Sequence, residues 1–309
     1  MAPQTKTDTS AELLSPDILA TVDDLELLAR VTVDGLLSGR HRSRRRGPGG
    51  GAIAQYRHYV PGDDLRHVDW KQYARSERLN VKLYDEETDM RLAVILDATA
   101  SMAYRGTRAP WSKFRFGCAL AACLACLACR QGDRPGVFLY GGSPGVERCV
   151  ASGPQHVMGP LAAMLSRRRP DGSGHLQDAL DAAGEFIGSR GFVVLLSDLH
   201  DEERALAPLM RTLRNGRRDA LVLQILDDDE LELPFGEGVR FLDSETGEEV
   251  LASVPVIREE YGVAMRRFVS SVQEEGLSAQ ADTLLATTST PPGALLAGYL
   301  RRREAHLTC

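Results

Sequence analysis

From residue 91 onward the chain alternates between short apolar runs and amphipathic stretches. The runs RLAVILD and GFVVLLSD are almost wholly apolar and have the length of single strands. Between such runs, apolar residues recur at the three- and four-residue spacing of helices that bury one face. The predicted strands cover 91–97, 136–141, 146–150, 191–198, 219–226 and 278–287, and the predicted helices cover 113–130, 155–165, 176–187, 202–213, 263–274 and 292–303. Apolar strands that alternate with helices predict an α/β fold, a mostly parallel sheet with helices on both faces.

Residues 47–90 follow a different pattern, with two alternating segments on either side of a charged stretch. IAQYRHYV and LNVKLYDEE alternate apolar and polar residues as half-exposed strands do. Pro61 and Gly62 favour a turn after the first segment. The stretch between them, DDLRHVDWKQYARSERL, is dense in charges of both signs. We therefore expect a small antiparallel insertion with a short helix inside it, preceding the parallel sheet.

The first 46 residues combine a polar tail, a helix and a basic segment. Ser15, Pro16 and Asp17 form a helix start, and apolar residues follow them at helical spacing. RHRSRRR, from Arg40 to Arg46, then runs into a glycine cluster, which is typical of a solvated hinge. The pattern divides the chain into 1–46, 47–90 and 91–309.

Composition narrows the classes of function. The 309 residues are 43% hydrophobic and 26% charged, as in globular proteins that bury a large core. A net charge of −6 gives no general attraction to nucleic acid or to anionic membranes. No apolar run approaches the roughly 20 residues of a membrane span, and the N-terminus lacks the pattern of a signal peptide. We expect a cytoplasmic protein.

Oxygen-bearing side chains gather where two of the predicted strands end. Asp97 closes one strand and is followed by Thr99 and Ser101, and Asp198 closes another. Ligands of open parallel sheets collect beyond the carboxyl ends of the strands. If these two strands are neighbours, their carboxylates and hydroxyls form the hard oxygen donor set that Mg²⁺ prefers. The sequence thus raises the hypothesis of a magnesium site.

Two stretches resemble known families. DATAS, from Asp97 to Ser101, resembles the Asp-x-Ser-x-Ser sequence of the metal-ion-dependent adhesion site in von Willebrand factor A domains, and SDLHD resembles the later aspartate loop of that site. The pattern Tyr-x-x-Gly-Asp-Asp-x-Arg-x-x-Asp-Trp, from Tyr59 to Trp70, is similar to the signature of the family known as domain of unknown function 58, or DUF58. This resemblance runs from about residue 47 to residue 303. It implies a von Willebrand factor A-like, Rossmann-like sheet.

The resemblance also implies a ligand set for the metal. Its members are Asp97, Thr99, Ser101 and Asp198. In a further loop the fold usually has Gly-Gly-Thr, whereas this chain reads GSGHL and places Gly174 where the threonine belongs. Ser173 and His175 are the alternatives for that ligand, and a weakened or lost site is a third outcome.

The charged block of the family signature is the second candidate site. Its members are Asp63, Asp64, Arg66, Asp69, Arg75 and Arg78. Mixed charges of this kind usually form a salt-bridged surface, and no nucleophile stands beside them. We interpret the block as a partner-binding or structural network, Trp70 as a core residue, and the acidic run from Asp227 to Glu230 as surface.

The predicted function is that of a non-enzymatic protein-interaction module. Members of the resembled family commonly accompany MoxR-type AAA+ ATPases, which implies an adaptor role between such an ATPase and a client protein. Two alternatives stay open. One is a metal-dependent hydrolase that uses Asp97 and Asp198 to activate water, although no general base stands out. The other is RNA binding through Arg40 to Arg46.

Overall fold

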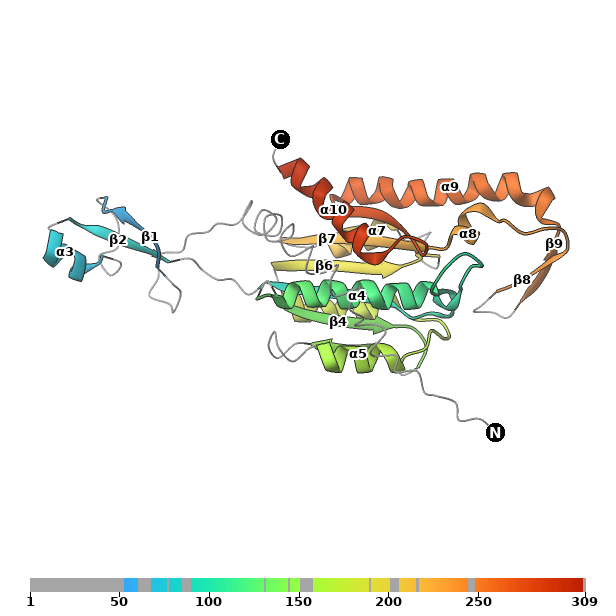
Figure 1. Cartoon of the computed structure of the whole chain (residues 1–309), viewed down its shortest axis with the longest axis horizontal. Coiled ribbons are helices and arrows are strands. Elements are labelled where there is room, and N and C mark those ends of the chain that lie inside the picture. The colour runs from blue at the N-terminus through green and yellow to red at the C-terminus, as the bar shows by residue number, and fades with distance from the viewer. Residues whose placement is uncertain are drawn as a thin grey trace. The chain divides into compact units, whose positions relative to one another are not determined.

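The computed structural model describes residues 53–60, 68–76, 78–84, 90–130, 132–143, 145–150, 158–188, 190–200, 206–214, 217–243 and 248–307. The described residues fall into two compact units, one from 53 to 84 and one from 90 to 307 (Figure 1). The helix and the basic hinge predicted within residues 1–46 lie outside the described residues.

The small unit is an antiparallel pair with a helix between its strands. β1 (Ile53–His58) pairs with β2 (Asn80–Tyr84), and His58 stands opposite Asn80. α3 (Trp70–Ser76) lies between them in sequence. Val68 forms a single bridge to Val81, and both side chains are buried. The predicted insertion with its helical excursion is confirmed.

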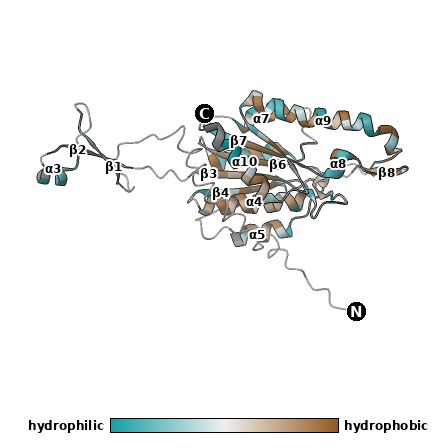
Figure 2. Cartoon of the chain, turned by 45° about the horizontal axis from the view of Figure 1, so that its top comes forward, coloured by the Kyte–Doolittle hydropathy of each residue, from teal (hydrophilic) through white to brown (hydrophobic). Residues whose placement is uncertain are grey.

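The large unit is built on a six-stranded sheet with the order β10-β7-β6-β3-β4-β5. All pairs are parallel except the edge strand β5, which is antiparallel to β4. Its strands are β3 (Arg91–Asp97), β4 (Arg134–Tyr140), β5 (Glu147–Val150), β6 (Arg190–Ser197), β7 (Arg217–Leu226) and β10 (Asp282–Thr287). The strands are hydrophobic along most of their length (Figure 2). The predicted mostly parallel sheet of an α/β fold is confirmed.

Helices cover both faces of this sheet (Figure 1). On one face α4 (Lys113–Arg130) packs on the strands and is flanked by α5 (Met158–Arg167) and α10 (Pro292–Leu307). Gly117 brings α4 close, because a Cβ at this position would lie 2.6 Å from Leu96 Cδ1. The other face packs against α6 (Leu176–Ile187), α7 (Leu206–Leu213) and α9 (Val254–Ala279).

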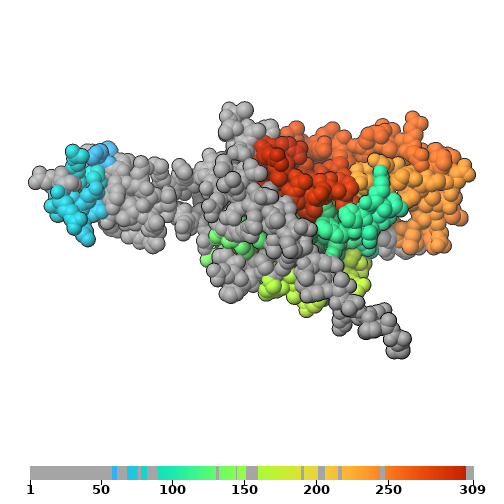
Figure 3. Space-filling model, viewed as in Figure 1, coloured from blue at the N-terminus to red at the C-terminus, as the bar shows by residue number. Residues whose placement is uncertain are grey.

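Four features of the large unit were not predicted. They are the short 3₁₀ helix η2 (Ala100–Ala103), the short helix α8 (Asp228–Glu232), the hairpin of β8 (Val239–Leu242) with β9 (Glu249–Ala252), and the first turns of α9. α9 buries no residue between Val254 and Met265, so its first turns carry no apolar stripe. It runs along the surface of the unit (Figure 3). None of the helices in the described ranges is both long enough and apolar enough to cross a membrane.

Candidate functional site

The two acidic strand ends lie side by side at the carboxyl edge of the sheet. β3 and β6 are neighbouring parallel strands, with Leu96 opposite Leu196. Asp97 is the last residue of β3, and Asp198 directly follows β6. Both carboxylates are buried. The sequence prediction that they share one edge is therefore confirmed, and Thr99 and Ser101 follow on the same loop, with their hydroxyl oxygens 3.2 Å apart.

Asp97 accepts hydrogen bonds on both of its oxygens. Its Oδ1 accepts from the backbone N–H of Thr99 at 2.8 Å and from the Thr99 hydroxyl at 2.7 Å. Its Oδ2 accepts from the Tyr140 hydroxyl at 2.8 Å and from the Ser197 hydroxyl at 2.6 Å. A carboxylate has about four lone-pair directions, so these four donors use its accepting capacity.

Asp198 is paired with a lysine that sequence reasoning missed. Lys113, the first residue of α4, places its Nζ 2.8 Å from Asp198 Oδ2 and 2.6 Å from Glu230 Oε1. Its side chain is only 1% exposed. A buried ammonium is stable in a protein only when carboxylates surround it in this way. The signal was present in the sequence, because a lysine in the first turn of an apolar helix opposes the helix dipole and needs another reason to be there.

The charged groups of this cluster shift one another's pKa values. Burial raises the pKa of Asp97 to about 6, and the charge of Asp198 acts in the same direction against the hydrogen bonds from Ser197 and Thr99. Burial would also raise the pKa of Asp198, but the Lys113 ammonium lowers it below its ordinary value. Burial opposes the charged form of Lys113, yet its two carboxylate partners hold its pKa above the ordinary value. At neutral pH the site is an ionised lysine between two ionised carboxylates.

The acidic run from Asp227 to Glu230 belongs to this edge, and its interpretation as surface is wrong. Asp227 and Asp229 are fully buried. Asp227 caps α8 and also accepts from the Gly106 backbone N–H at 3.0 Å and from the Thr288 hydroxyl at 2.7 Å. The run therefore holds the loop after Ser101 against the sheet by hydrogen bonds, and its Glu230 pairs with Lys113.

The loop with the missing threonine packs too closely for a side chain at Gly174. A Cβ there would lie 2.6 Å from both the Cα and the N of Gly141. Ser173 is exposed, and its backbone carbonyl accepts from the Gly142 N–H at 3.0 Å. His175 is exposed at the start of α6. The glycine is thus required by the approach of two backbone segments, and a threonine in its place would need the backbone to move.

These contacts do not fit a divalent cation bound by the implied ligand set. The accepting directions of Asp97 are taken by four protein donors, and one oxygen of Asp198 is taken by Lys113. Gly174 supplies no hydroxyl. Within the part of the chain that the structure describes, no group of three or more His, Cys, Asp or Glu side chains is arranged to hold a metal. The Lys113 ammonium already supplies a positive charge to Asp198.

The charged block of the small unit is only partly described. Asp63, Asp64 and Arg66 lie outside the described residues, as do Arg40 to Arg46 of the RNA hypothesis. Asp69 is buried, and its Oδ1 accepts from the backbone N–H groups of Lys71 and Gln72 at the start of α3. Arg75 is exposed in the last turn of that helix.

Trp70 is not a core residue, contrary to the interpretation of the sequence. Its side chain is 56% exposed on α3, and Tyr73 beside it is 39% exposed. The two rings stand edge to face with their centroids 6.2 Å apart. Among the residues of this unit whose side chains the structure describes, Val68 and Val81 are the buried apolar ones. The aromatic pair lies on the surface of α3 instead.

Comparison with known proteins places these features in a family. Residues 55–269 match the family model described as "Protein of unknown function DUF58". The chain is 30% identical over 256 residues to the uncharacterized proteins Rv1480 of Mycobacterium tuberculosis and Mb1516 of Mycobacterium bovis, covering 81% of this chain and 78% of each relative.

Similar solved structures include the conserved hypothetical protein BatB of Bacteroides thetaiotaomicron, at 11% identity and a TM-score of 0.43. That match covers 70% of this chain and 99% of BatB. They also include the SpRpn10 VWA domain, at 10% identity and a TM-score of 0.39, covering 69% of this chain and 94% of that domain.

Proposed function

The chain belongs to the DUF58 family, and we propose that it is a non-enzymatic protein-interaction module that serves as an adaptor for a MoxR-type AAA+ ATPase. The family supports an interaction module. The ATPase as partner rests on the resemblance of the Tyr59–Trp70 signature to a family whose members commonly accompany such ATPases. The adaptor would present a client protein to the ATPase.

The observation that carries this proposal is the exposed aromatic pair formed by Trp70, the last residue of the family signature, and Tyr73, three positions after it. Trp70 and Tyr73 lie three positions apart on α3 and are both exposed, and Arg75 is exposed in the last turn of the same helix. Tryptophan, tyrosine and arginine are the residue types that dominate the energetics of protein interfaces. An exposed tryptophan on a small unit also loses little conformational entropy on binding, because it has few rotatable bonds. We propose that this surface of α3 contacts the ATPase.

The carboxyl edge of the sheet is proposed as the surface for the client, acting without a bound metal. Ser101 and Tyr104 are partly exposed there, whereas Asp97, Asp198 and Lys113 lie buried beneath them. In this proposal the buried ion pairs hold the loop in shape and the hydroxyl and aromatic groups above them make the contact. Metal titration tests this proposal against the magnesium hypothesis of the sequence analysis.

The geometry around Asp97 and Asp198 does not support the hydrolase alternative. A general base needs a free acceptor within reach of water, and Asp97 already accepts four hydrogen bonds. Asp198 is neutralised by Lys113. Neither carboxylate is poised to take a proton from water.

The test is co-purification with a MoxR-type ATPase encoded in the same genome, in ATP, in ADP and without nucleotide. We expect a complex in at least one state. The double variant Trp70→Ala with Tyr73→Ala should weaken it by about 30-fold or more, as for interface hot spots. Leu251→Ala is the matched control, because Leu251 is an exposed apolar residue on the β8–β9 hairpin of the other unit.

Two further variants separate the surfaces. Arg75→Glu should weaken the complex with the ATPase, whereas Ser101→Ala should leave it intact and weaken only capture of the client. Each variant must first show the circular dichroism and melting profile of the wild type. If no ATPase co-purifies under any nucleotide condition, the adaptor proposal is wrong. If the aromatic double variant binds as the wild type does, the assignment of α3 is wrong.

A further inference from the structure

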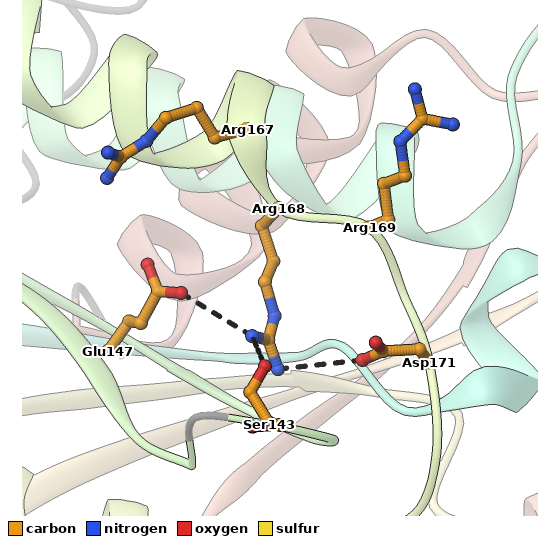
Figure 4. Close-up of a pocket in the computed structure, with 6 residues that line it drawn as sticks. All are labelled: Ser143, Glu147, Arg167, Arg168, Arg169 and Asp171. Carbon is orange, nitrogen blue, oxygen red and sulfur yellow. Dashed lines mark hydrogen bonds and ion pairs between the residues drawn. The ribbon is translucent and has the colours of Figure 1, made fainter.

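A pocket of about 470 Å³ opens beside the carboxyl edge, at the end of α5. It is lined by Ser143, Glu147, Arg167, Arg168, Arg169 and Asp171 (Figure 4). Two backbone hydrogen bonds link the pocket to the candidate site. The Asp171 N–H donates to Ala98 O at 3.1 Å, and the Ala100 N–H donates to Gly172 O at 2.9 Å. The same loop thus forms one wall of the pocket and supports the Asp97–Ser101 loop.

Arg168 is buried in this pocket, and two of its three guanidinium nitrogens make no hydrogen bond within the described part of the chain. Its side chain is only 5% exposed. Nη1 donates to the backbone carbonyl of Ser143 at 2.7 Å and lies 3.4 Å from Glu147 Oε1. Nε and Nη2 are both buried and have no hydrogen-bond acceptor among the residues that the structure describes. The Oδ1 of Asp171 is 3.8 Å from Nη2, which is too far for a hydrogen bond.

The two unpaired nitrogens are those that bind an anion side-on. The N–H groups of Nε and Nη2 lie along one edge of the planar guanidinium and point in parallel, so they can donate to both oxygens of one carboxylate. Buried donors of a charged group are almost always paired in folded proteins, because leaving them unpaired is costly. An unpaired buried edge beside an open pocket therefore points to an absent partner group.

The charge of the lining selects the kind of anion. Three arginines against the two carboxylates of Glu147 and Asp171 leave one net positive charge. Arg167 and Arg169 point away from the Arg168 guanidinium on either side of it, so they line the rim (Figure 4). A singly charged carboxylate matches this balance, whereas the two nearby acidic groups repel a doubly charged phosphate more strongly.

We infer that this pocket binds a carboxylate side chain from an acidic segment of a partner protein, through Nε and Nη2 of Arg168. The side chain of Asp171 is 62% exposed and turns into solvent to admit the incoming carboxylate. The inference rests on the proposed function in one respect, because the acidic segment belongs to a protein partner. The inference adds that this partner carries an aspartate- or glutamate-rich segment, which passes between Arg167 and Arg169.

The test uses a fluorescently labelled hexaglutamate peptide and the full chain, with binding measured by polarisation. Arg168→Lys keeps the charge but removes the paired N–H edge, so it should weaken binding by about tenfold or more, the equivalent of one charge-assisted hydrogen bond. Asp171→Asn removes a competing carboxylate and should tighten binding several-fold. Arg169→Lys, an equivalent change on the exposed rim, is the matched control and should bind nearly as the wild type does.

The Asp171→Asn variant tests the inference even if Arg168→Lys is destabilised. If Arg168 had only a structural role, Asp171→Asn would not increase the affinity for the peptide. Equal binding by the wild type, Arg168→Lys and Asp171→Asn would overturn the inference. Inorganic phosphate that competes as well as free glutamate would overturn the choice of a carboxylate. Peptide binding that depends on Arg168, without any ATPase complex, would refute only the adaptor proposal. An ATPase complex with no dependence of peptide binding on Arg168 would refute only the pocket.

Discussion

Two charged clusters lie on either side of the loop around Asp171, and they differ in how their buried charges are paired. Beneath the carboxyl edge of the sheet, the Lys113 ammonium contacts Asp198 and Glu230, and Asp97 accepts four hydrogen bonds. In the neighbouring pocket, Arg168 is also buried, but its Nε and Nη2 have no acceptor within the described part of the chain. The charges of the first cluster are paired with one another, whereas one edge of the Arg168 guanidinium is not paired.

The difference separates a structural ion network from a binding site. A buried charge that is fully paired within the chain holds its surroundings in place and has nothing left to offer a ligand. A buried charge with an unpaired edge still has hydrogen-bond donors that can bind a ligand. Sequence motifs at the first cluster suggested a ligand site, whereas the sequence around Arg168 carries no known motif.

The largest expected effect is that of breaking the complete network. Lys113→Met leaves Asp198 and Glu230 as buried carboxylates without their cation, and we expect the free energy of unfolding to fall by about 3–5 kcal/mol. Urea denaturation at pH 7 measures it. The triple variant that adds Asp198→Asn and Glu230→Gln should recover most of the loss. A loss below about 1 kcal/mol in the single variant would show that the lysine is not held as described.

The next effect is a dependence on pH. The pKa of Asp97 is raised from 3.8 to about 6 in the folded chain, so folding favours its protonated form. Its contribution to stability is therefore complete below about pH 4 and is lost as the pH rises through 6, by an amount on the order of 3 kcal/mol. The isosteric variant Asp97→Asn lacks this titration. Denaturation curves of both proteins from pH 4 to 7 should diverge, with the wild type losing stability relative to the variant. Parallel curves would contradict the raised pKa.

The glycine in the loop gives a smaller effect. Gly174→Ala places a Cβ 2.6 Å from the backbone of Gly141, and we expect a loss of about 1–3 kcal/mol from the forced movement. Gly174→Thr should cost at least as much and should not create a metal site. Gly159→Ala is the matched control, since nothing lies within 4 Å of a Cβ at that exposed position. Equal thermal stability of the Gly174 and Gly159 variants would mean that the two loops do not touch.

The smallest effect on stability is expected at Arg168. Arg168→Gln removes a buried guanidinium, but its carboxylate neighbours Glu147 and Asp171 are partly exposed and remain solvated. We expect a loss of about 1 kcal/mol, near that of one hydrogen bond and well below the loss for Lys113→Met. The same urea measurement compares the two. A loss as large as that of Lys113→Met would place Arg168 in the structural network and remove the contrast between the clusters.

Much of the fold could be predicted because its elements bury continuous or periodic apolar faces. β3 and α4 have the predicted bounds, because every position of β3 after Arg91 and most positions of α4 lie in the core. The β8–β9 hairpin and the start of α9 escaped prediction because residues such as Leu251 and Val256 are exposed there, and hydrophobic patterning reports only buried faces.

The candidate site was predictable in its position but not in its chemistry. The sequence placed Asp97 and Asp198 at one edge because strand ends in a parallel sheet meet there. It could not show that Lys113, 85 positions from Asp198, fills the space between Asp198 and Glu230. Trp70 was assigned to the core from its residue type, but its side chain is 56% exposed, because residue type alone does not show which face of a short helix is covered. Arg168 was missed because an unpaired guanidinium edge is a property of three-dimensional packing alone.

The central claim is that the carboxyl edge is completed by the Lys113 ammonium and needs no metal. Calorimetric titration of Mn²⁺ into the wild-type chain at pH 7, beside Ser101→Ala, tests it most directly. Both proteins should give the same weak, unsaturated heats at millimolar Mn²⁺, as expected of scattered surface carboxylates. Saturable binding of one Mn²⁺ by the wild type that is lost in Ser101→Ala would contradict the claim.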